Sequence, residues 1–186
     1  IISMYTNESY LLDEDGIPSK FIEKKNQPLE EWNDWEIAPW DLLINPNNEL
    51  GSGDFGIVYL ASWRGTHVAA KVVNENISEK KKKLLINELD TMTKIRHPNI
   101  VQFLGYIDKP FILVMEYMSN GDLLSYSQKN FLFNNTKINI CLDILKGIAY
   151  LHDKRPNFII HRDIKSENML VTPSGVIKIA DFGLTK

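Results

Sequence analysis

Three closely spaced glycines followed by a strand-like run constrain this chain more than any other feature. The stretch Gly51-Ser52-Gly53-Asp54-Phe55-Gly56 lets a backbone approach a phosphate closely and point its N–H groups at it. In dinucleotide-binding folds the same glycine spacing leads directly into a helix. Here it leads into Ile57-Val58-Tyr59-Leu60, a β-branched and aromatic run typical of a strand. We therefore expect a glycine-rich hairpin over a nucleotide phosphate, and the pattern argues against a nicotinamide-binding enzyme.

Strand patterns come first along the chain and helical patterns later. The predicted strands occupy residues 42–73, with a turn at Arg64-Gly65, and then about 101–107 and 111–117. The predicted helices occupy residues 79–95, 123–128 and 136–152, and a last hairpin over 169–180 turns at Pro173-Ser174-Gly175. This order indicates an α+β fold with two lobes.

A lysine ends one of the apolar strands. Lys71 closes the run Val68-Ala69-Ala70-Lys71, and burying an unpaired ammonium is costly. On the following predicted helix, Glu88 lies one turn from both Leu84 and Met92, which puts this carboxylate on the apolar stripe. An ion pair between Lys71 and Glu88 explains both charges and could hold the α- and β-phosphates of a nucleotide. A purely structural ion pair is the alternative.

Acidic and amide side chains gather near the last hairpin. His161-Arg162-Asp163-Ile164-Lys165-Ser166-Glu167-Asn168 precedes it, and Asp181-Phe182-Gly183 follows it. Carboxylate and amide oxygens are the ligands that magnesium prefers. A carboxylate that is not used for the metal would be able to orient a hydroxyl nucleophile.

The sequence resembles the eukaryotic protein kinase family in both the content and the order of its motifs. These motifs are GxGxFGxV, VAAK, a helix glutamate, HRDxKxxN and DFG. Residues 35–186 carry the resemblance. It implies a two-lobed kinase fold with a β-rich lobe at 35–117 and part of a helical lobe at 118–186, after an extension or linker over residues 1–34. Three stretches are similar to the tyrosine-kinase-like group, which includes the Raf and mixed-lineage kinases: Asn33-Asp34-Trp35-Glu36-Ile37, Ala61-Ser62-Trp63-Arg64-Gly65 and Arg96-His97-Pro98-Asn99-Ile100-Val101.

The resemblance implies a role for each matching residue, with ATP and Mg²⁺ as cofactors. Asp163 would be the catalytic base, Lys165 would contact the transferred phosphate, and Lys71 paired to Glu88 would hold the other phosphates. Asn168 and Asp181 would bind magnesium. The residues implied to surround the nucleotide are Gly51, Gly53 and Gly56 over the phosphates, Met115, Glu116 and Met118 at the hinge beside adenine, and Leu50, Val58, Ala69 and Leu170 around the adenine ring.

The same loop bears on the substrate. Lys165 two residues after Asp163 is the serine/threonine pattern, whereas tyrosine kinases usually carry an alanine-arginine arrangement here. The resemblance therefore implies a signalling kinase for protein serine and threonine hydroxyls, with a protein substrate and an upstream activating kinase as partners. The alternative from another class is a pseudokinase or scaffold fragment that only binds nucleotide or partners.

Composition removes several other classes of protein. The formal net charge of −3 gives no indication of a nucleic-acid or membrane-surface partner. The single cysteine, Cys141, cannot form an internal disulfide and suits a reducing, cytoplasmic compartment. No apolar run reaches the roughly 18 residues of a membrane span. The oligomeric state is not indicated.

The two ends of the sequence predict a fragment. The chain begins at Ile1 rather than at a methionine and ends three residues after Gly183, where the resembling family continues with an activation segment, an Ala-Pro-Glu motif and several helices. Without those helices we expect one apolar face of the helix over residues 136–152 to lack its cover. That face carries Ile138, Leu142, Leu145 and Ala149. We also expect the 186 residues alone to have a poorly folded second half and to be weakly active or inactive.

Overall fold

A computed structural model describes residues 34–53, 56–74, 89, 92–156 and 158–181. These residues form two compact units. The first unit contains the described residues up to 74 together with Leu104–Tyr117, and the second contains Leu89, residues 92–103 and the described residues from Met118 onward. Each unit is described by itself.

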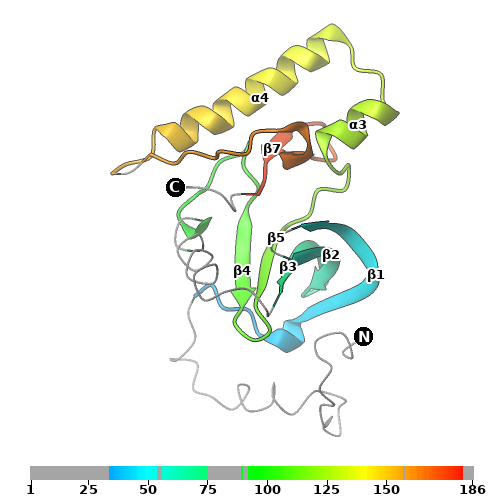
Figure 1. The fold of residues 1–186 in the computed structure, drawn as a ribbon, viewed down its shortest axis with the longest axis vertical. Coiled ribbons are helices and arrows are strands. Elements are labelled where there is room, and N and C mark those ends of the chain that lie inside the picture. Colours follow the sequence, from blue (N-terminus) through cyan, green and yellow to red (C-terminus); the bar gives the residue numbers. More distant parts are fainter. Residues whose placement is uncertain (1–33, 54–55, 75–88, 90–91, 157, 182–186) are drawn as a thin grey trace, which may run out of the picture. The chain divides into compact units, whose positions relative to one another are not determined.

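The first unit is built on a five-stranded sheet in the order β1-β2-β3-β5-β4 (Figure 1). Its strands are β1 (Leu42–Gly53), β2 (Gly56–Trp63), β3 (Thr66–Val73), β4 (Phe103–Ile107) and β5 (Ile112–Glu116). The pairs β1–β2, β2–β3 and β3–β5 are antiparallel. The strands predicted from the sequence are confirmed. The turn at Arg64-Gly65 is tight because both residues have positive φ, 49° and 81°, a conformation that glycine adopts without steric cost.

One face of this sheet carries the core of the first unit. Side chains alternate along a strand, so paired residues of antiparallel strands point to the same side. The buried face consists of Tyr59, Ala61, Val68, Ala70, Ile112 and Val114, packed with Ile37, Leu42, Ile44 and Ile107. The opposite face is less uniformly buried, because Val73 and Leu113 are 3% exposed whereas Ala69 and Met115 are half-buried.

A short segment before β1 pairs with the edge strand β4. The Ile37 N–H donates to Tyr106 O at 2.7 Å, and the Tyr106 N–H donates to Trp35 O at 2.9 Å. Gly105 has φ +156°, and a Cβ there would lie 2.7 Å from Trp35 O. Glycine at this position thus allows the segment to lie against β4 and lets Ile37 join the core.

The second unit contains two helices and a small hairpin. Its elements are α3 (Leu123–Lys129), α4 (Asn134–His152), the 3-10 turn η4 (Ser166–Asn168), β6 (Met169–Val171) and β7 (Ile177–Ile179). The expected helices and hairpin are confirmed, with helix ends one or two residues from their predicted places. Helix α3 begins where it does because Asp122 accepts a hydrogen bond from the Ser125 N–H at 2.8 Å, as N-cap residues do.

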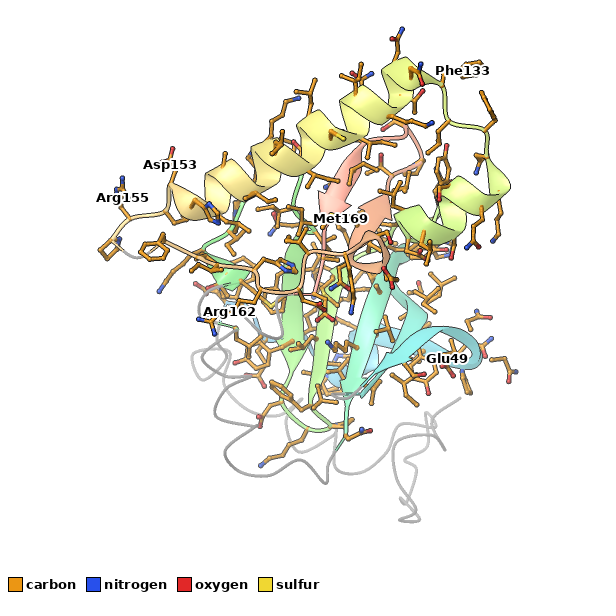
Figure 2. The ribbon with its side chains drawn as sticks, turned by 45° about the horizontal axis from the view of Figure 1, so that its top comes forward. Glu49, Phe133, Asp153, Arg155, Arg162 and Met169 are labelled. Carbon is orange, nitrogen blue, oxygen red and sulfur yellow. The ribbon has the colours of Figure 1, made fainter. Side chains whose placement is uncertain are left out.

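Helix α4 is apolar on two faces. Ile140 is buried, with Ile144 and Ile148 beside it, against a core formed by Met169, Val171, Ile177 and Ile179 of the hairpin. Figure 2 shows side chains of α4 projecting toward this hairpin and away from it. The outer face carries Ile138, Leu142 and Leu145, which are 58%, 45% and 60% exposed. This outer face is the one that the sequence predicted to lack cover, and its exposure confirms that expectation.

Most of the helix predicted over residues 79–95 lies outside the described residues. Leu89 and Met92 are helical, and they are 9% and 6% exposed, while Ile95 just beyond them is 3% exposed. Their burial agrees with the predicted apolar stripe. In the described part of the chain, helices are too short or too polar to cross a membrane.

Candidate active site

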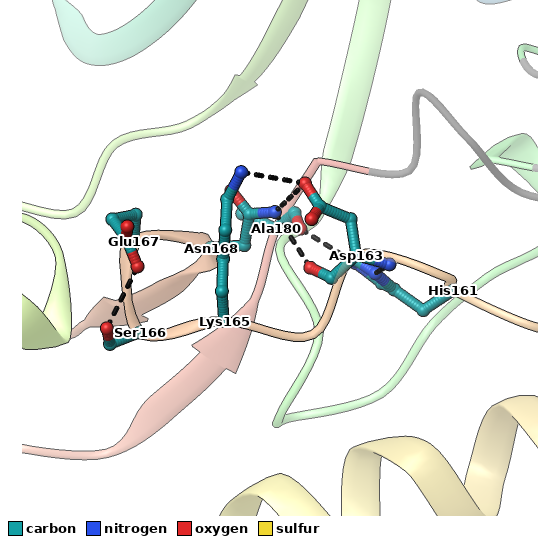
Figure 3. A network of polar contacts seen from close by, with 7 residues as sticks. All are labelled: His161, Asp163, Lys165, Ser166, Glu167, Asn168 and Ala180. Carbon is teal, nitrogen blue, oxygen red and sulfur yellow. Dashed lines mark hydrogen bonds and ion pairs between the residues drawn. The ribbon is translucent and has the colours of Figure 1, made fainter.

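The loop between α4 and β6 brings a base, a cation and an amide together. The Lys165 ammonium Nζ lies 2.9 Å from Asp163 Oδ2, and the Asn168 side chain donates to the same oxygen at 2.8 Å and to Asp163 O at 2.9 Å (Figure 3). The 3-10 turn η4 lets Asn168 reach back, because its N–H donates to Lys165 O at 3.0 Å. These three residues lie within six consecutive positions of the sequence, and the structure brings their side chains into one cluster.

His161 connects this loop to the end of the hairpin. The imidazole is 3% exposed. Its Nδ1 accepts from the Asp163 N–H at 3.3 Å, and its Nε2 lies 2.9 Å from Ala180 O. Because Nδ1 is the acceptor, Nε2 carries the hydrogen and donates it to the Ala180 carbonyl. His161 thus contacts the backbone of Asp163 and the residue before Asp181 at the same time.

The contacts in the loop keep Asp163 ionised. The hydrogen bond from Lys165 and then the one from Asn168 hold the pKa of the Asp163 carboxyl below its usual 3.8. The same hydrogen bond raises the pKa of Lys165 above its usual 10.5. At neutral pH the pair is therefore a carboxylate facing an ammonium. A carboxylate in this state can accept a proton.

The donor set beside Asp163 fits a hard cation. Asn168 uses its amide nitrogen on Asp163, so its Oδ1 is the amide atom that can face a metal. The Ala180 N–H donates to Asn168 O at 2.8 Å, which ties Asp181 to Asn168 through one residue. Asp181 is exposed and has φ +61°. The described residues contain no group of three His, Cys, Asp or Glu that could hold a metal. One carboxylate and one amide suit magnesium, which keeps waters and substrate phosphates as its other ligands.

In the first unit, four of the residues expected to contact a nucleotide share the sheet face opposite the core. Val58 pairs with Lys71, and Ala69 pairs with Met115. Since paired and alternate residues point to one side, these four side chains lie on that face, where all are half-buried. The sequence placed them in one site, and the register brings them together. The predicted partner of Lys71, Glu88, lies outside the described residues.

The three glycines differ in what surrounds them. A Cβ at Gly56 would lie 2.0 Å from Val72 O, so this glycine is required by the close approach of β3. A Cβ at Gly51 or at Gly53 would meet no described atom within 4 Å. Packing among the described residues therefore explains why residue 56 is a glycine. It does not explain why residues 51 and 53 are glycines.

The remaining predicted site residues are placed as follows. Leu50 on β1 is 46% exposed, and Glu116 at the end of β5 pairs with Val68. Met118 belongs to the second unit, where it is buried and its carbonyl accepts from the Gly121 N–H at 3.1 Å. Leu170 on β6 is half-buried and forms a bridge with Asp122.

The sequence pattern did not single out one buried polar residue of the second unit. Asn99 is 3% exposed, and its side chain donates to Ile177 O at 2.9 Å. In the sequence, Asn99 belonged only to the stretch Arg96–Val101 that resembles the tyrosine-kinase-like group. Its place directly before the apolar pair Ile100-Val101 is a signal that could have indicated an inward-facing polar side chain.

Comparison with known proteins agrees with this arrangement. Residues 44–186 match the family described as protein tyrosine and serine/threonine kinase. The chain belongs to the protein kinase family. The match confirms the resemblance drawn from the motifs and the α+β fold with a β-rich unit followed by helices.

Individual protein kinases are similar over most of this chain. It is 43% identical over 168 residues to serine/threonine-protein kinase VIK of Arabidopsis thaliana, covering 86% of this chain and 38% of that protein. It is 36% identical over 155 residues to serine/threonine-protein kinase CTR1 of the same plant, covering 80% and 19%. It is 40% identical over 159 residues to tyrosine-protein kinase Btk of Drosophila melanogaster, covering 82% and 19%. The kinase chain thus spans between 19% and 38% of the length of these relatives.

Proposed function

We propose that this protein transfers the γ-phosphate of ATP to serine and threonine hydroxyls of protein substrates. The observation that carries the proposal is the contact of Lys165 Nζ with Asp163 Oδ2 at 2.9 Å, with Asn168 on the same carboxylate. Because the chain spans only part of the length of its relatives, the activity of the whole protein belongs to the proposal as well.

In the proposed reaction, Asp163 is the base. Its carboxylate orients the substrate hydroxyl and takes the proton as the hydroxyl oxygen bonds to the γ-phosphorus and the bond to the β-phosphate oxygen breaks. Lys165 neutralises the charge on the phosphoryl group in transit. Its present hydrogen bond to Asp163 puts it within reach of any hydroxyl that the base contacts.

The other roles follow from the donor sets. Asn168 Oδ1 and Asp181 would hold magnesium, whose charge offsets that of the β- and γ-phosphates. Lys71, paired with Glu88, would hold the remaining phosphates. The backbone at Gly51, Gly53 and Gly56 would cover them, since a backbone without side chains can approach a phosphate closely.

The adenine ring would lie among apolar side chains beside the hinge. The residues proposed for this task are Leu50, Val58, Ala69, Met115, Glu116, Met118 and Leu170. Support comes from the register, which puts Val58, Ala69 and Met115 on the sheet face opposite the core. Exposed Leu50 provides further apolar surface on β1.

Specificity for serine and threonine rests on the loop itself. Lys165 follows Asp163 by two residues, which is the arrangement of serine/threonine kinases in the family that the chain belongs to. The similar proteins bear names of both kinds, VIK and CTR1 as serine/threonine kinases and Btk as a tyrosine kinase. We further propose a signalling role in the cytoplasm, with a protein substrate and an upstream activating kinase.

Phosphate transfer to matched peptides tests the proposal. Peptide pools that differ only in a central serine, threonine or tyrosine are incubated with the protein, Mg²⁺ and γ-labelled ATP. Transfer to the serine and threonine pools is expected, with little to tyrosine. The control is Asp163→Asn, which keeps the size of the side chain and removes the base, and should slow transfer by roughly 10²- to 10⁴-fold.

Nucleotide binding separates the two classes of function. Asp163→Asn should bind ATP as the unchanged protein does, because the base does not hold the nucleotide. A protein that binds ATP but transfers no phosphate to any pool would be a non-catalytic nucleotide-binding module. Equal transfer by the Asp163→Asn variant would also overturn the assignment of the base.

A further inference from the structure

Asn99 is a buried amide whose hydrogen bonds hold strand β7. The side chain is 3% exposed, and Nδ2 donates to Ile177 O at 2.9 Å. The Asn99 N–H is also engaged, because it donates to His97 Nδ1 at 3.1 Å. Buried polar groups in folded proteins are nearly always paired in this way, and removing one partner leaves the other unsatisfied.

The residues around Asn99 continue the β6–β7 sheet on its other edge. Ile100 and Ile179 form a parallel bridge. The Ile179 N–H donates to Asn99 O, and the Val101 N–H donates to Ile179 O, both at 2.9 Å. The next bond of a parallel ladder would come from the Asn99 N–H to Ile177 O. That N–H is used on His97, so the Asn99 side chain supplies the bond instead.

Helix α4 packs against both Asn99 and β7. Gly147 is buried, and a Cβ there would lie 2.7 Å from Ile179 Cδ1 and 2.9 Å from Asn99 O. The helix backbone therefore packs directly on both partners, and neither can move toward it. Close packing of this kind transmits a shift of one element to the next.

Strand β7 leads within two residues to Asp181. Between them, Ala180 is held by the loop between α4 and β6, because its N–H donates to Asn168 O at 2.8 Å and its carbonyl lies 2.9 Å from His161 Nε2. Asp181 itself has φ +61°. Residues other than glycine adopt a positive φ uncommonly, although aspartate does so more often than most.

We propose that Asn99 is a positioning residue for Asp181, acting through β7. The Asn99 side chain holds β7 at Ile177, and the loop between α4 and β6 holds Ala180. The segment that ends directly before Asp181 is thus fixed at two points. The proposal rests on the proposed function, in which Asp181 binds magnesium. It assigns to Asn99 an effect on metal dependence that a general packing role would not produce.

Two substitutions remove the amide donor, and one matched control leaves the Ile177 bond intact. Asn99→Ala removes the side chain, and Asn99→Asp keeps its size but replaces the amide donor with a carboxylate. The control is Asn120→Ala, because Asn120 Nδ2 also donates to a backbone carbonyl of the hairpin, Thr172 O, at 2.8 Å. That bond lies at the turn end, away from Asp181. Either Asn99 variant can be used for the test, provided that it folds.

Two measurements on the protein report on the position of Asp181. The first is the hydrogen-exchange rate of the Ala180 amide, which needs no ligand. The second is the concentration of free Mg²⁺ that gives half-maximal phosphate transfer at saturating ATP. The Asn99 variants are expected to increase both by several-fold to about tenfold, the range that loss of one hydrogen bond produces. Asn120→Ala is expected to lower the thermal midpoint and to change neither.

The outcomes separate this inference from the proposed function. If the Asn99 variants and Asn120→Ala change the Ala180 exchange rate and the Mg²⁺ requirement equally, Asn99 has no positioning role. A second outcome is that the unchanged protein transfers no phosphate, while the Asn99 variants, but not Asn120→Ala, exchange the Ala180 amide faster. In that case the proposed function fails, but the positioning of Asp181 by Asn99 is supported.

Discussion

The ammonium of Lys165 lies 2.9 Å from the Oδ2 atom of Asp163, on the same oxygen that Asn168 reaches at 2.8 Å. The base of the proposed reaction is thus held by a cation only two residues away in the sequence. Because the two side chains lie on one short loop, their contact depends on the local backbone of the second unit alone. Substituting Lys165 should therefore change the pKa of the Asp163 carboxyl directly.

Removing this cation should change both the ionisation of Asp163 and the reaction. In Lys165→Ala the largest cause of the lowered pKa of Asp163 is lost, so the pKa should rise toward 3.8. NMR titration of the aspartate carboxyl carbons measures this shift. Phosphate transfer should fall on the order of 10²-fold, as when one charge-stabilising donor is removed from an active site.

The sign of the pH effect follows from the direction of the shift. A carboxyl whose pKa is lowered by folding stabilises the folded state above its ordinary pKa, and this contribution is lost as pH falls through the lowered value. Lys129→Ala, at the exposed end of α3, is the control and should leave the titration of Asp163 unchanged. An unchanged pKa in Lys165→Ala would contradict the contact.

The glycines of the β1–β2 hairpin should respond differently to alanine. Gly56→Ala puts a Cβ 2.0 Å from Val72 O, so the strands must separate and the first unit should lose at least about 1–3 kcal/mol of stability. Gly53→Ala meets no described atom within 4 Å and should unfold at nearly the same denaturant concentration. It should instead weaken ATP binding, because the backbone can no longer approach the phosphates closely.

Chemical denaturation and nucleotide titration of both variants check this pair. Gly65→Ala, at the β2–β3 turn, adds a Cβ that meets no described atom but has φ +81°. It provides a control for strain without loss of nucleotide contact. Unchanged ATP affinity in Gly53→Ala would remove the phosphate role from that glycine.

Two isoleucines on α4 provide a matched test of its two faces. Ile140 is 9% exposed in the hairpin core, whereas Ile138, two residues earlier, is 58% exposed. Ile140→Ala should destabilise the second unit by about 2–4 kcal/mol, because a buried side chain is lost and a cavity remains. Ile138→Ala should change stability by roughly 0.5 kcal/mol or less. Urea unfolding followed by circular dichroism measures both, and similar losses would show that the outer face is covered in solution.

His97 should make the second unit less stable in acid. Burial, and then the charge of Lys146, lower the pKa of His97 from 6.5. The neutral ring is needed because Nδ1 accepts the Asn99 N–H, and the ring also stacks on Tyr150 at 4.8 Å. Burial, the charge of Lys146 and the bond from the Asn99 N–H all disfavour protonation of His97.

The direction of this second pH effect is opposite to that of a salt-bridged histidine. Because folding lowers the pKa, the unfolded chain binds the proton more tightly. The contribution of His97 to stability is therefore complete above pH 6.5 and declines as pH falls toward the lowered value. NMR titration of the imidazole tests this, and Lys146→Ala should raise the pKa part of the way. A His97 pKa above 6.5 would contradict the arrangement.

Much of the fold could be predicted because its signals are local. The β-branched run after Gly56 and the turn at Arg64-Gly65 specify neighbouring strands, and β2 and β3 have the predicted bounds. The last hairpin likewise follows from its turn residues at 173–175. Within β3, Lys71 and Ala69 are alternate residues and therefore share a face.

Other features depend on contacts between segments far apart in the sequence. The sequence showed an apolar stripe through Ile138, Leu142 and Leu145, but only the packing revealed that the face with Ile140 meets the hairpin. A helix with two apolar faces carries two stripes, and periodicity cannot rank them. The bond from Asn99 to Ile177, 78 residues apart, was likewise outside the reach of a local pattern.

By itself, the sequence determined the chemistry that this protein can offer: a base, cations and oxygen ligands in the order of a protein kinase, on strands and loops set by local propensity. Tertiary structure decided which atoms meet. It brought the ammonium of Lys165 into contact with the Asp163 carboxylate. It also made a glycine at position 56 necessary for the close approach of β3, and it paired Asn99 with the strand that leads to Asp181. The physical reason is that propensity and alternation act over a few residues. Hydrogen bonds and steric contacts between distant segments exist only once the chain has folded.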